Sequence, residues 1–211
     1  MRLVLFFISG CLCFGQSLSV GVIGGVHGTD DITGAATSES KRYIVGPALD
    51  LGLPFGLGVE FDVLYSREGY RTSYGNFAGS SFTSERANSW QFPLLARYKL
   101  PFPFLKPFVE AGYATGILPG STSINTISID LLTDIATFGR LHESTNWKTN
   151  HGFIAGGGVQ FGLGRLRLAP ELRYTHWNNP AITGTYADGP SYQSTQDQVD
   201  VLVGISWRLS R

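Results

Sequence analysis

The chain has few charged residues, and this shortage excludes several classes of function. Its 211 residues are 15% charged, below the roughly 25% of a typical soluble domain. Lys+Arg and Asp+Glu number 16 each, so the net charge is zero. This balance argues against a nucleic-acid-binding protein, which needs a surplus of basic residues. Hydrophobic residues make up 43% of the chain, which argues against intrinsic disorder.

Cysteine is almost absent, and both cysteines, Cys11 and Cys13, lie near the start of the chain. They fall within an apolar run that follows Met1 and Arg2 and is too short for a transmembrane helix, which needs about 20 residues. We expect residues 1–16 to be a secretory signal peptide, with a lipoprotein signal ending at Cys11 as the alternative. The remaining domain, 17–211, would then contain no disulfide, thiolate nucleophile or cysteine metal site.

The rest of the sequence alternates apolar and polar residues with a period of two, which is typical of β-strands. The alternation is clearest in residues 57–65, 90–100, 166–174 and 199–209, and weaker in 18–26, 43–51, 107–115 and 153–161. Short connections lie around 54–56, 102–104 and 162–164. Long polar connections cover 27–41, 67–88, 117–150 and 177–197, with a short helix expected at 127–135. The sequence therefore predicts an all-β, eight-stranded, antiparallel up-and-down fold.

Alternation alone does not say which face is inside, because a soluble lipocalin-like barrel has an apolar interior. Strands of about ten residues can cross a bilayer when tilted. The apolar faces carry no charge, and aromatic residues gather near the strand ends, as in the girdles of membrane barrels. We therefore expect a transmembrane β-barrel that is apolar outside and polar inside. The predicted interfacial aromatics are Tyr65, Trp90, Phe102, Phe104, Tyr113, Phe161, Tyr174, Trp177 and Trp207.

The polar faces carry acids and bases in near-equal numbers, among them Arg42, Arg165 and Arg208. Opposite charges in a narrow lumen should pair, because an isolated buried charge is costly. Arg97 and Glu110 are symmetric about the 102–104 turn and should face each other. The network is interpreted either as a structural plug or as a narrow ion path. Its predicted members are Asp50, Glu60, Asp62, Arg97, Lys99, Glu110, Arg167, Glu171, Arg173 and Asp200.

Four stretches resemble the bacterial outer-membrane β-barrel domain family: QFPLLARY (91–98), KPFVEAG (106–112), AGGGVQF (155–161) and LAPELRY (168–174). The small barrels of this family include the OmpA transmembrane domain and the OmpX and OmpW types. The resemblance implies a monomeric protein of the bacterial outer membrane. Its implied partners are outer-membrane lipids, lipopolysaccharide and the barrel-insertion machinery.

No catalytic, cofactor-binding or metal-binding motif is found in the sequence. His27, His142, His151 and His176 lack metal-ligand spacing, and the glycines at 156–158 lack the lysine of a phosphate loop. His176-Trp177-Asn178-Asn179 is similar to the His-x-Ser-Asn motif of lipid A deacylases, but Asn178 stands at the serine position. An amide is not an activated nucleophile, so His176 and Trp177 are interpreted as interfacial anchors.

The leading functional prediction is a non-enzymatic barrel with a structural or surface-interaction role. An extracellular ligand would bind through 67–88 and 117–150, because loops on a rigid scaffold commonly carry recognition. A narrow channel for small solutes and a lipid-modifying enzyme are the alternatives.

Overall fold

The computed structural model describes residues 17–29, 32–34, 36–38, 40–76, 79–102, 104–118, 121–130, 135–144, 148–180, 183–185 and 191–209. The predicted signal peptide, 1–16, lies outside the described residues. In the described part of the chain, no helix is both long and apolar enough to cross a membrane.

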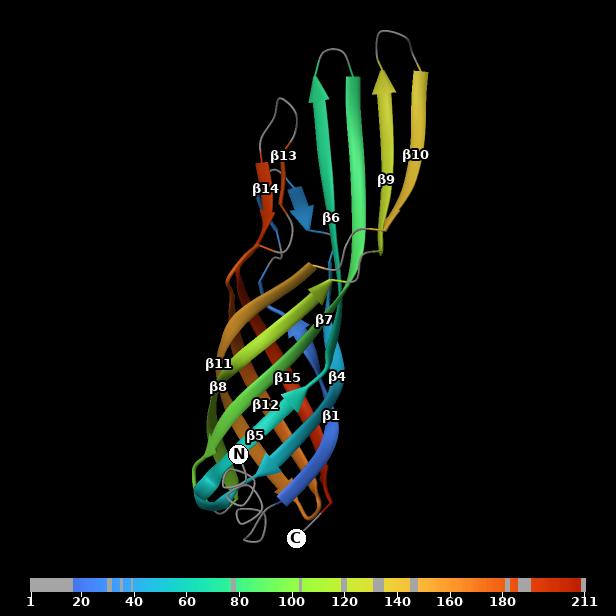
Figure 1. The fold of residues 1–211 in the computed structure, drawn as a ribbon. Helices are drawn as coiled ribbons and strands as arrows, with labels where there is room; N and C mark the ends of the chain where they lie inside the picture. Colours follow the sequence, from blue (N-terminus) through green and yellow to red (C-terminus); the bar gives the residue numbers. More distant parts are fainter. Residues whose placement is uncertain are drawn as a thin grey trace, which may run out of the picture.

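The eight predicted strands are confirmed and form one closed antiparallel barrel (Figure 1). Each strand pairs with its neighbour along the chain, and the last strand pairs with the first, with Val22 opposite Ile205. Within the barrel wall, closure gives every strand two partners and leaves no sheet edge. The barrel strands are β1 (Ser17–His27), β4 (Lys41–Gly52), β5 (Leu57–Asp62) continued by β6 (Leu64–Asn76), β7 (Gly79–Lys99), β8 (Leu105–Leu118), β11 (Lys148–Leu163), β12 (Leu166–Trp177) and β15 (Asp197–Arg208).

The third barrel strand is interrupted at Val63, which separates β5 from β6. The Val63 N–H still donates to the Pro47 carbonyl of β4, at 3.0 Å. Gly46 lies so close to the Val63 carbonyl oxygen that a Cβ atom at this position would overlap it. The irregularity therefore needs a glycine on the neighbouring strand.

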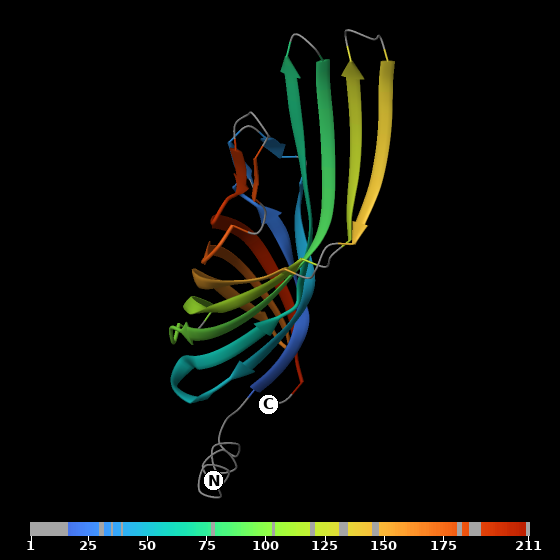
Figure 2. The same ribbon diagram turned by 45° about the horizontal axis from the view of Figure 1, so that its top comes forward.

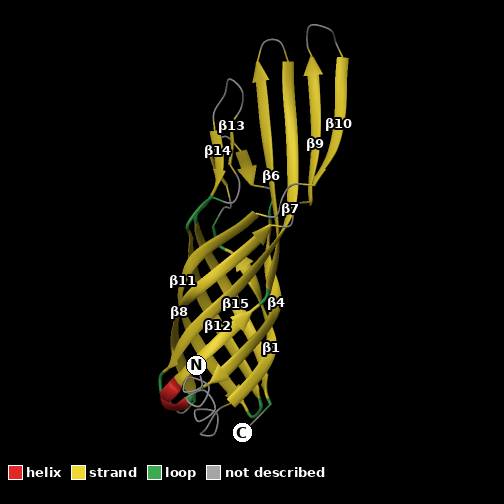
Figure 3. Cartoon of the chain, in the orientation of Figure 1, coloured by secondary structure: helices red, strands yellow, loops and turns green. Residues whose placement is uncertain are grey.

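Tight connections join the strands at one end of the barrel, called here the turn end. The first is a single turn of 3₁₀ helix, Pro54–Gly56, drawn red in Figure 3. Phe55 and Gly164 have positive φ values of 62° and 67° in two of these turns. The three predicted short connections are confirmed at this end, which is also where β1 begins and β15 ends (Figure 1).

The opposite end, called here the hairpin end, corrects the prediction of long irregular loops. Strands β6 and β7 continue well beyond the barrel, and further strands extend them into a projecting sheet in the order β10-β9-β7-β6-β3 (Figure 2). A second, smaller sheet has the order β13-β14-β2. The added strands are β2 (Ile32–Gly34), β3 (Ala36–Ser38), β9 (Ser121–Asp130), β10 (Ile135–Ser144), β13 (Thr183–Thr185) and β14 (Ser191–Ser194).

The helix expected at 127–135 is also wrong. Residues 127–130 end β9 and Ile135 begins β10, while the residues between them lie outside the described part of the chain. Ile127 pairs with Phe82 of β7 on one side and with Phe138 of β10 on the other. Pairing with a strand on each side therefore decides the local structure.

The two faces of the barrel wall differ as predicted, with apolar residues outside and polar residues inside. On the outer face, Leu94 is 54% and Val109 is 60% exposed. On the inner face, Asp62 is 0% and Arg173 is 2% exposed. This distribution is the reverse of that in a water-soluble barrel and suits a wall surrounded by hydrocarbon.

Candidate functional site

The barrel lumen contains the largest cluster of buried polar groups among the described residues. Inward-facing side chains alternate with outward-facing ones along each strand, so every barrel strand contributes to the interior. Buried carboxylates from β5, β8 and β12 meet two buried arginines near the middle of the lumen. We call this set the central ion network: Glu60, Asp62, Arg97, Glu110, Glu171 and Arg173.

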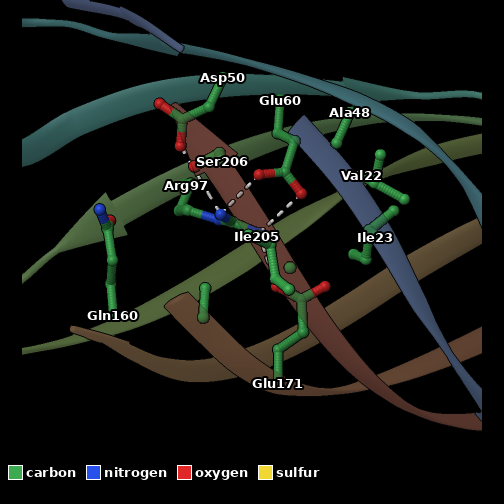
Figure 4. Close-up of a pocket in the computed structure, with 12 residues that line it drawn as sticks. Val22, Ile23, Ala48, Asp50, Glu60, Arg97, Gln160, Glu171, Ile205 and Ser206 are labelled. Atoms are coloured by element: carbon green, nitrogen blue, oxygen red, sulfur yellow. Dashed lines mark hydrogen bonds and ion pairs between the residues drawn. The ribbon is translucent and has the colours of Figure 1, made fainter. Parts of the chain in front are cut away.

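Arg97, on β7, connects three glutamates from three other strands. Its guanidinium nitrogens lie 2.5 Å from a Glu60 oxygen, 2.6 Å from a Glu110 oxygen and 2.9 Å from a Glu171 oxygen. Figure 4 shows Glu60 and Glu171 approaching Arg97 from different walls of the lumen. The pairing of Arg97 with Glu110 follows from their register, as the sequence predicts. The guanidinium also stacks on Phe108, with Cζ 4.1 Å from the ring centroid.

Arg173, on β12, holds the same glutamates from the other side and adds Asp62. Its Nη1 donates to Asp62 at 2.7 Å and its Nε donates to Glu110 at 2.9 Å. Its Nη2 lies 2.7 Å from Glu60 and 2.6 Å from Glu171. Two guanidinium groups therefore share three glutamates, and every charged group in this layer has a partner of opposite charge.

Three further predicted residues form a layer between the central ion network and the turn end. The Lys99 ammonium donates to Asp50 at 2.6 Å. Arg167 donates to the Ser19 hydroxyl at 3.0 Å and lies 3.9 Å from the other Asp50 oxygen. Arg97 lies 3.7 Å from Asp50, which links this layer to the centre.

Asp200, the tenth predicted member, belongs to a separate cluster towards the hairpin end. It lies 2.6 Å from His27 Nδ1 and accepts a hydrogen bond from Gln198 at 2.8 Å. Two of the bases predicted on the polar faces, Arg42 and Arg165, are exposed at the strand ends and lie outside the packed lumen.

An apolar layer, which the sequence analysis did not identify, separates the central ion network from the hairpin end. On one side Trp177 packs with Leu95, Ala114 and Ile154. On the other side lies a second buried cluster: Ile23, Ile44, Leu64 and Leu202. Leu64, Leu95 and Leu202 occupy polar-face positions of their strands, and this departure from alternation is the signal that could have revealed the layer.

Trp177 is therefore not an interfacial aromatic, which corrects the prediction. It is only 8% exposed, and its indole N–H donates to Gln198 at 3.0 Å inside the barrel. Its neighbour His176 faces outward, as expected from strand parity, with Nδ1 2.7 Å from an Asp197 oxygen. Tyr174 donates to the same oxygen at 2.5 Å.

The other predicted aromatics lie on the outer surface. Trp90 and Tyr65 contact each other with ring centroids 5.1 Å apart, and Tyr113 contacts Phe153 at 5.5 Å, both towards the hairpin end. Tyr174 is exposed at the same end. The predicted aromatics that are exposed towards the turn end are Phe102, Phe104, Phe161 and Trp207.

The glutamates of the central ion network are the only described group of acidic or metal-ligating side chains close enough to hold a metal ion. Oxygens of Glu60, Glu110 and Glu171 lie within 4.8 Å of one another. Arg97 contacts all three and Arg173 does the same. A cation in this position would have to compete with two guanidinium groups, so the geometry is that of an ion-pair network.

The free space beside the network is small. A cavity of about 30 Å³ is lined by Asp50, Glu60, Arg97, Gln160 and Glu171 among others (Figure 4). This volume suits about one or two water molecules. The side chains that line this cavity therefore leave little free volume beside the central ion network.

A closed antiparallel barrel with an apolar outer surface and a charged, filled interior defines a β-barrel membrane protein. The family model described as "Outer membrane protein beta-barrel domain" matches residues 14–176, and the chain belongs to this family. It is a protein of the bacterial outer membrane. No curated protein matches the sequence.

Solved structures support the same fold. The chain is similar to Neisserial surface protein A, with a TM-score of 0.52 and 13% identity over 92% of this chain and 98% of that chain. It is also similar to a major outer membrane protein from Thermus thermophilus, with a TM-score of 0.50 and 14% identity over 92% of this chain and 100% of that chain. At this level of identity the similarity concerns the fold.

Proposed function

We propose that this protein is a closed, non-enzymatic barrel that anchors an interaction surface on the outside of the cell. The observation that carries the proposal is the central ion network. Arg97 and Arg173 connect carboxylates from strands on different sides of the lumen. A barrel crossed by such contacts is suited to rigid anchoring.

Two further features support a closed lumen. The apolar layer around Trp177 and Leu95 lies between the central network and the hairpin end. The Lys99–Asp50 pair and Arg167 lie on the other side of the network. An ion crossing the barrel would have to displace strong charge-assisted contacts and then pass through an apolar layer.

The projecting sheet supports a role at the surface. Strand β7 has 21 residues. It pairs with β8 inside the barrel and with β9 beyond it. The sheet is thus a direct continuation of the wall, so binding on it would occur on a rigid support. An extracellular ligand would contact the hairpins that cover 67–88 and 117–150.

We also propose that the protein is not an enzyme. Asp197 orients His176, which is one half of a catalytic arrangement. The nucleophile position carries Asn178, whose amide is not activated by a neighbouring base.

We expect the purified protein to give no stable openings in planar bilayers, because the central ion network, the Lys99–Asp50 pair and the apolar layer lie across the lumen. An inserted general porin measured under the same conditions would show that the assay detects channels. Stable openings whose ion selectivity changes in Arg97→Gln would place conduction in the lumen and contradict the closed-barrel proposal in favour of a narrow channel.

We expect Ser73→Cys, in an exposed part of β6 beyond the barrel, to react with a membrane-impermeant maleimide on intact cells. Arg165→Cys, in an exposed tight turn, should react only after the outer membrane is opened. The unsubstituted protein is the control, because its domain lacks cysteine once residues 1–16 are removed. Labelling of Arg165→Cys but not Ser73→Cys on intact cells would reverse the proposed orientation.

A further inference from the structure

We propose that the outward face of the barrel at the hairpin end binds the phosphate groups of lipopolysaccharide, the glycolipid of the outer leaflet, through Lys41, Arg67 and Arg86. The inference deepens the proposed function and rests on its orientation, with the hairpin end outside the cell. It concerns the outer surface of the wall, away from the lumen.

The three cations come together through strand pairing. Lys41 of β4 lies directly opposite Arg67 of β6. Arg67 in turn lies opposite Asn88 of β7, and Arg86 follows two residues further along the same face. All three side chains are exposed, and they line one surface hollow together with Glu68. The residues that line this hollow therefore carry three positive charges and one negative charge.

This cluster lies at the height where lipid headgroups begin. Tyr65 pairs with Trp90 on the same outward face, and Tyr65 also contacts Tyr43 with ring centroids 6.4 Å apart. Such aromatic residues lie at the boundary between hydrocarbon and headgroups. Arg67 is two residues beyond Tyr65, which is about 7 Å along an extended strand. The headgroup layer extends roughly 5–8 Å beyond the hydrocarbon.

The arrangement is unfavourable without an anion. Like charges directly opposite each other on neighbouring strands destabilise a sheet, as for Lys41 and Arg67. In the described part of the chain, neither of them nor Arg86 has a carboxylate within ion-pair distance. A phosphate group placed between them would remove the repulsion, and guanidinium groups can bind phosphate with two hydrogen bonds each.

The positive face extends one further position along β6. The register places Arg71 on the same face as Arg67 and Arg86, and its side chain is exposed. An anionic glycolipid headgroup layer would therefore meet several positive charges on this face.

The test compares two double variants with equal charge loss. Arg67→Gln/Arg86→Gln removes two cations of the cluster, and Lys106→Gln/Arg165→Gln removes two exposed cations at the turn end. Binding of purified, folded protein is measured without divalent cations, with lipopolysaccharide, phosphatase-treated lipopolysaccharide and inorganic phosphate as probes. Heat-modifiable gel migration shows that each variant is folded.

We expect the cluster variant to bind lipopolysaccharide at least roughly tenfold more weakly, because it loses charge-assisted hydrogen bonds to phosphate. The turn-end variant should bind like the original protein. Phosphatase treatment should weaken binding to both of these proteins but not to the cluster variant. Equal affinities for both variants would overturn the proposal. Competition by inorganic phosphate at the same concentration as lipopolysaccharide would overturn the lipid assignment and indicate a free-anion site.

This result is independent of the orientation test. Binding of purified protein depends on the cluster, whereas labelling of Ser73→Cys on intact cells depends on which end faces outward. A cluster that binds lipopolysaccharide on a protein labelled in the reverse orientation would refute the proposed function alone.

Discussion

Arg173→Met is expected to lower the free energy of unfolding by about 3–5 kcal/mol, the usual cost of leaving buried charges without their partner. Arg173 contacts Glu60, Asp62, Glu110 and Glu171. Its removal leaves four carboxylates with Arg97 as the nearest guanidinium. Asp62 is affected most, because Arg173 is its only ion partner among the described residues.

Urea unfolding of the barrel in lipid vesicles measures this loss, and Arg165→Met is the matched control. Arg165 is exposed in a tight turn, so the same substitution should change stability by less than about 0.5 kcal/mol. Adding Asp62→Asn to Arg173→Met should recover part of the loss, because one unpaired carboxylate is removed. If Arg173→Met and Arg165→Met unfold at the same urea concentration, the central ion network does not stabilise the barrel.

Trp177→Ala is also expected to lower the free energy of unfolding, because it removes a buried side chain from the apolar layer. The indole is buried with Leu95, Ala114 and Ile154, and its removal leaves a cavity that costs about 3–5 kcal/mol. Two glycines in the barrel wall leave space for the indole ring because they have no side chain. A Cβ atom at Gly116 would lie 3.1 Å from the indole, and one at Gly152 would lie 3.0 Å from it.

Trp90→Ala is the control for Trp177→Ala, because Trp90 lies on the outer surface. Its loss removes an interfacial contact without opening a cavity, so a smaller decrease in unfolding free energy is expected. Trp177→Phe should restore much of the packing but not the hydrogen bond to Gln198. A larger loss for Trp90→Ala than for Trp177→Ala would restore the interpretation of Trp177 as an interfacial anchor.

The barrel strands were predicted because hydrocarbon on one side and a polar lumen on the other impose a strong contrast between alternate residues. Strands β9 and β10 lie beyond the barrel, where no such contrast separates the two faces, and the Ser- and Thr-rich sequence of β9 resembles a loop. The grouping of Lys41, Arg67 and Arg86 is visible only once the register of their strands is known.

Within the central ion network, one contact was predictable from the sequence and another was not. Arg97 and Glu110 are neighbours across a tight turn, so counting residues from the turn predicts their contact. Arg173 and Asp62 are 111 residues apart and lie on strands that do not pair. Their contact depends on the diameter and closure of the barrel, which local alternation does not determine.

The sequence by itself determined the class of fold, the inward direction of the charged faces and the apolar outer wall. These follow from the period of a strand, which every local segment displays. The tertiary structure alone decided the partners within the lumen, the packing of Trp177 against Leu95, Ala114 and Ile154, and the sheet at the hairpin end. Each of these depends on register and closure, which bring together residues from distant strands that local alternation does not connect.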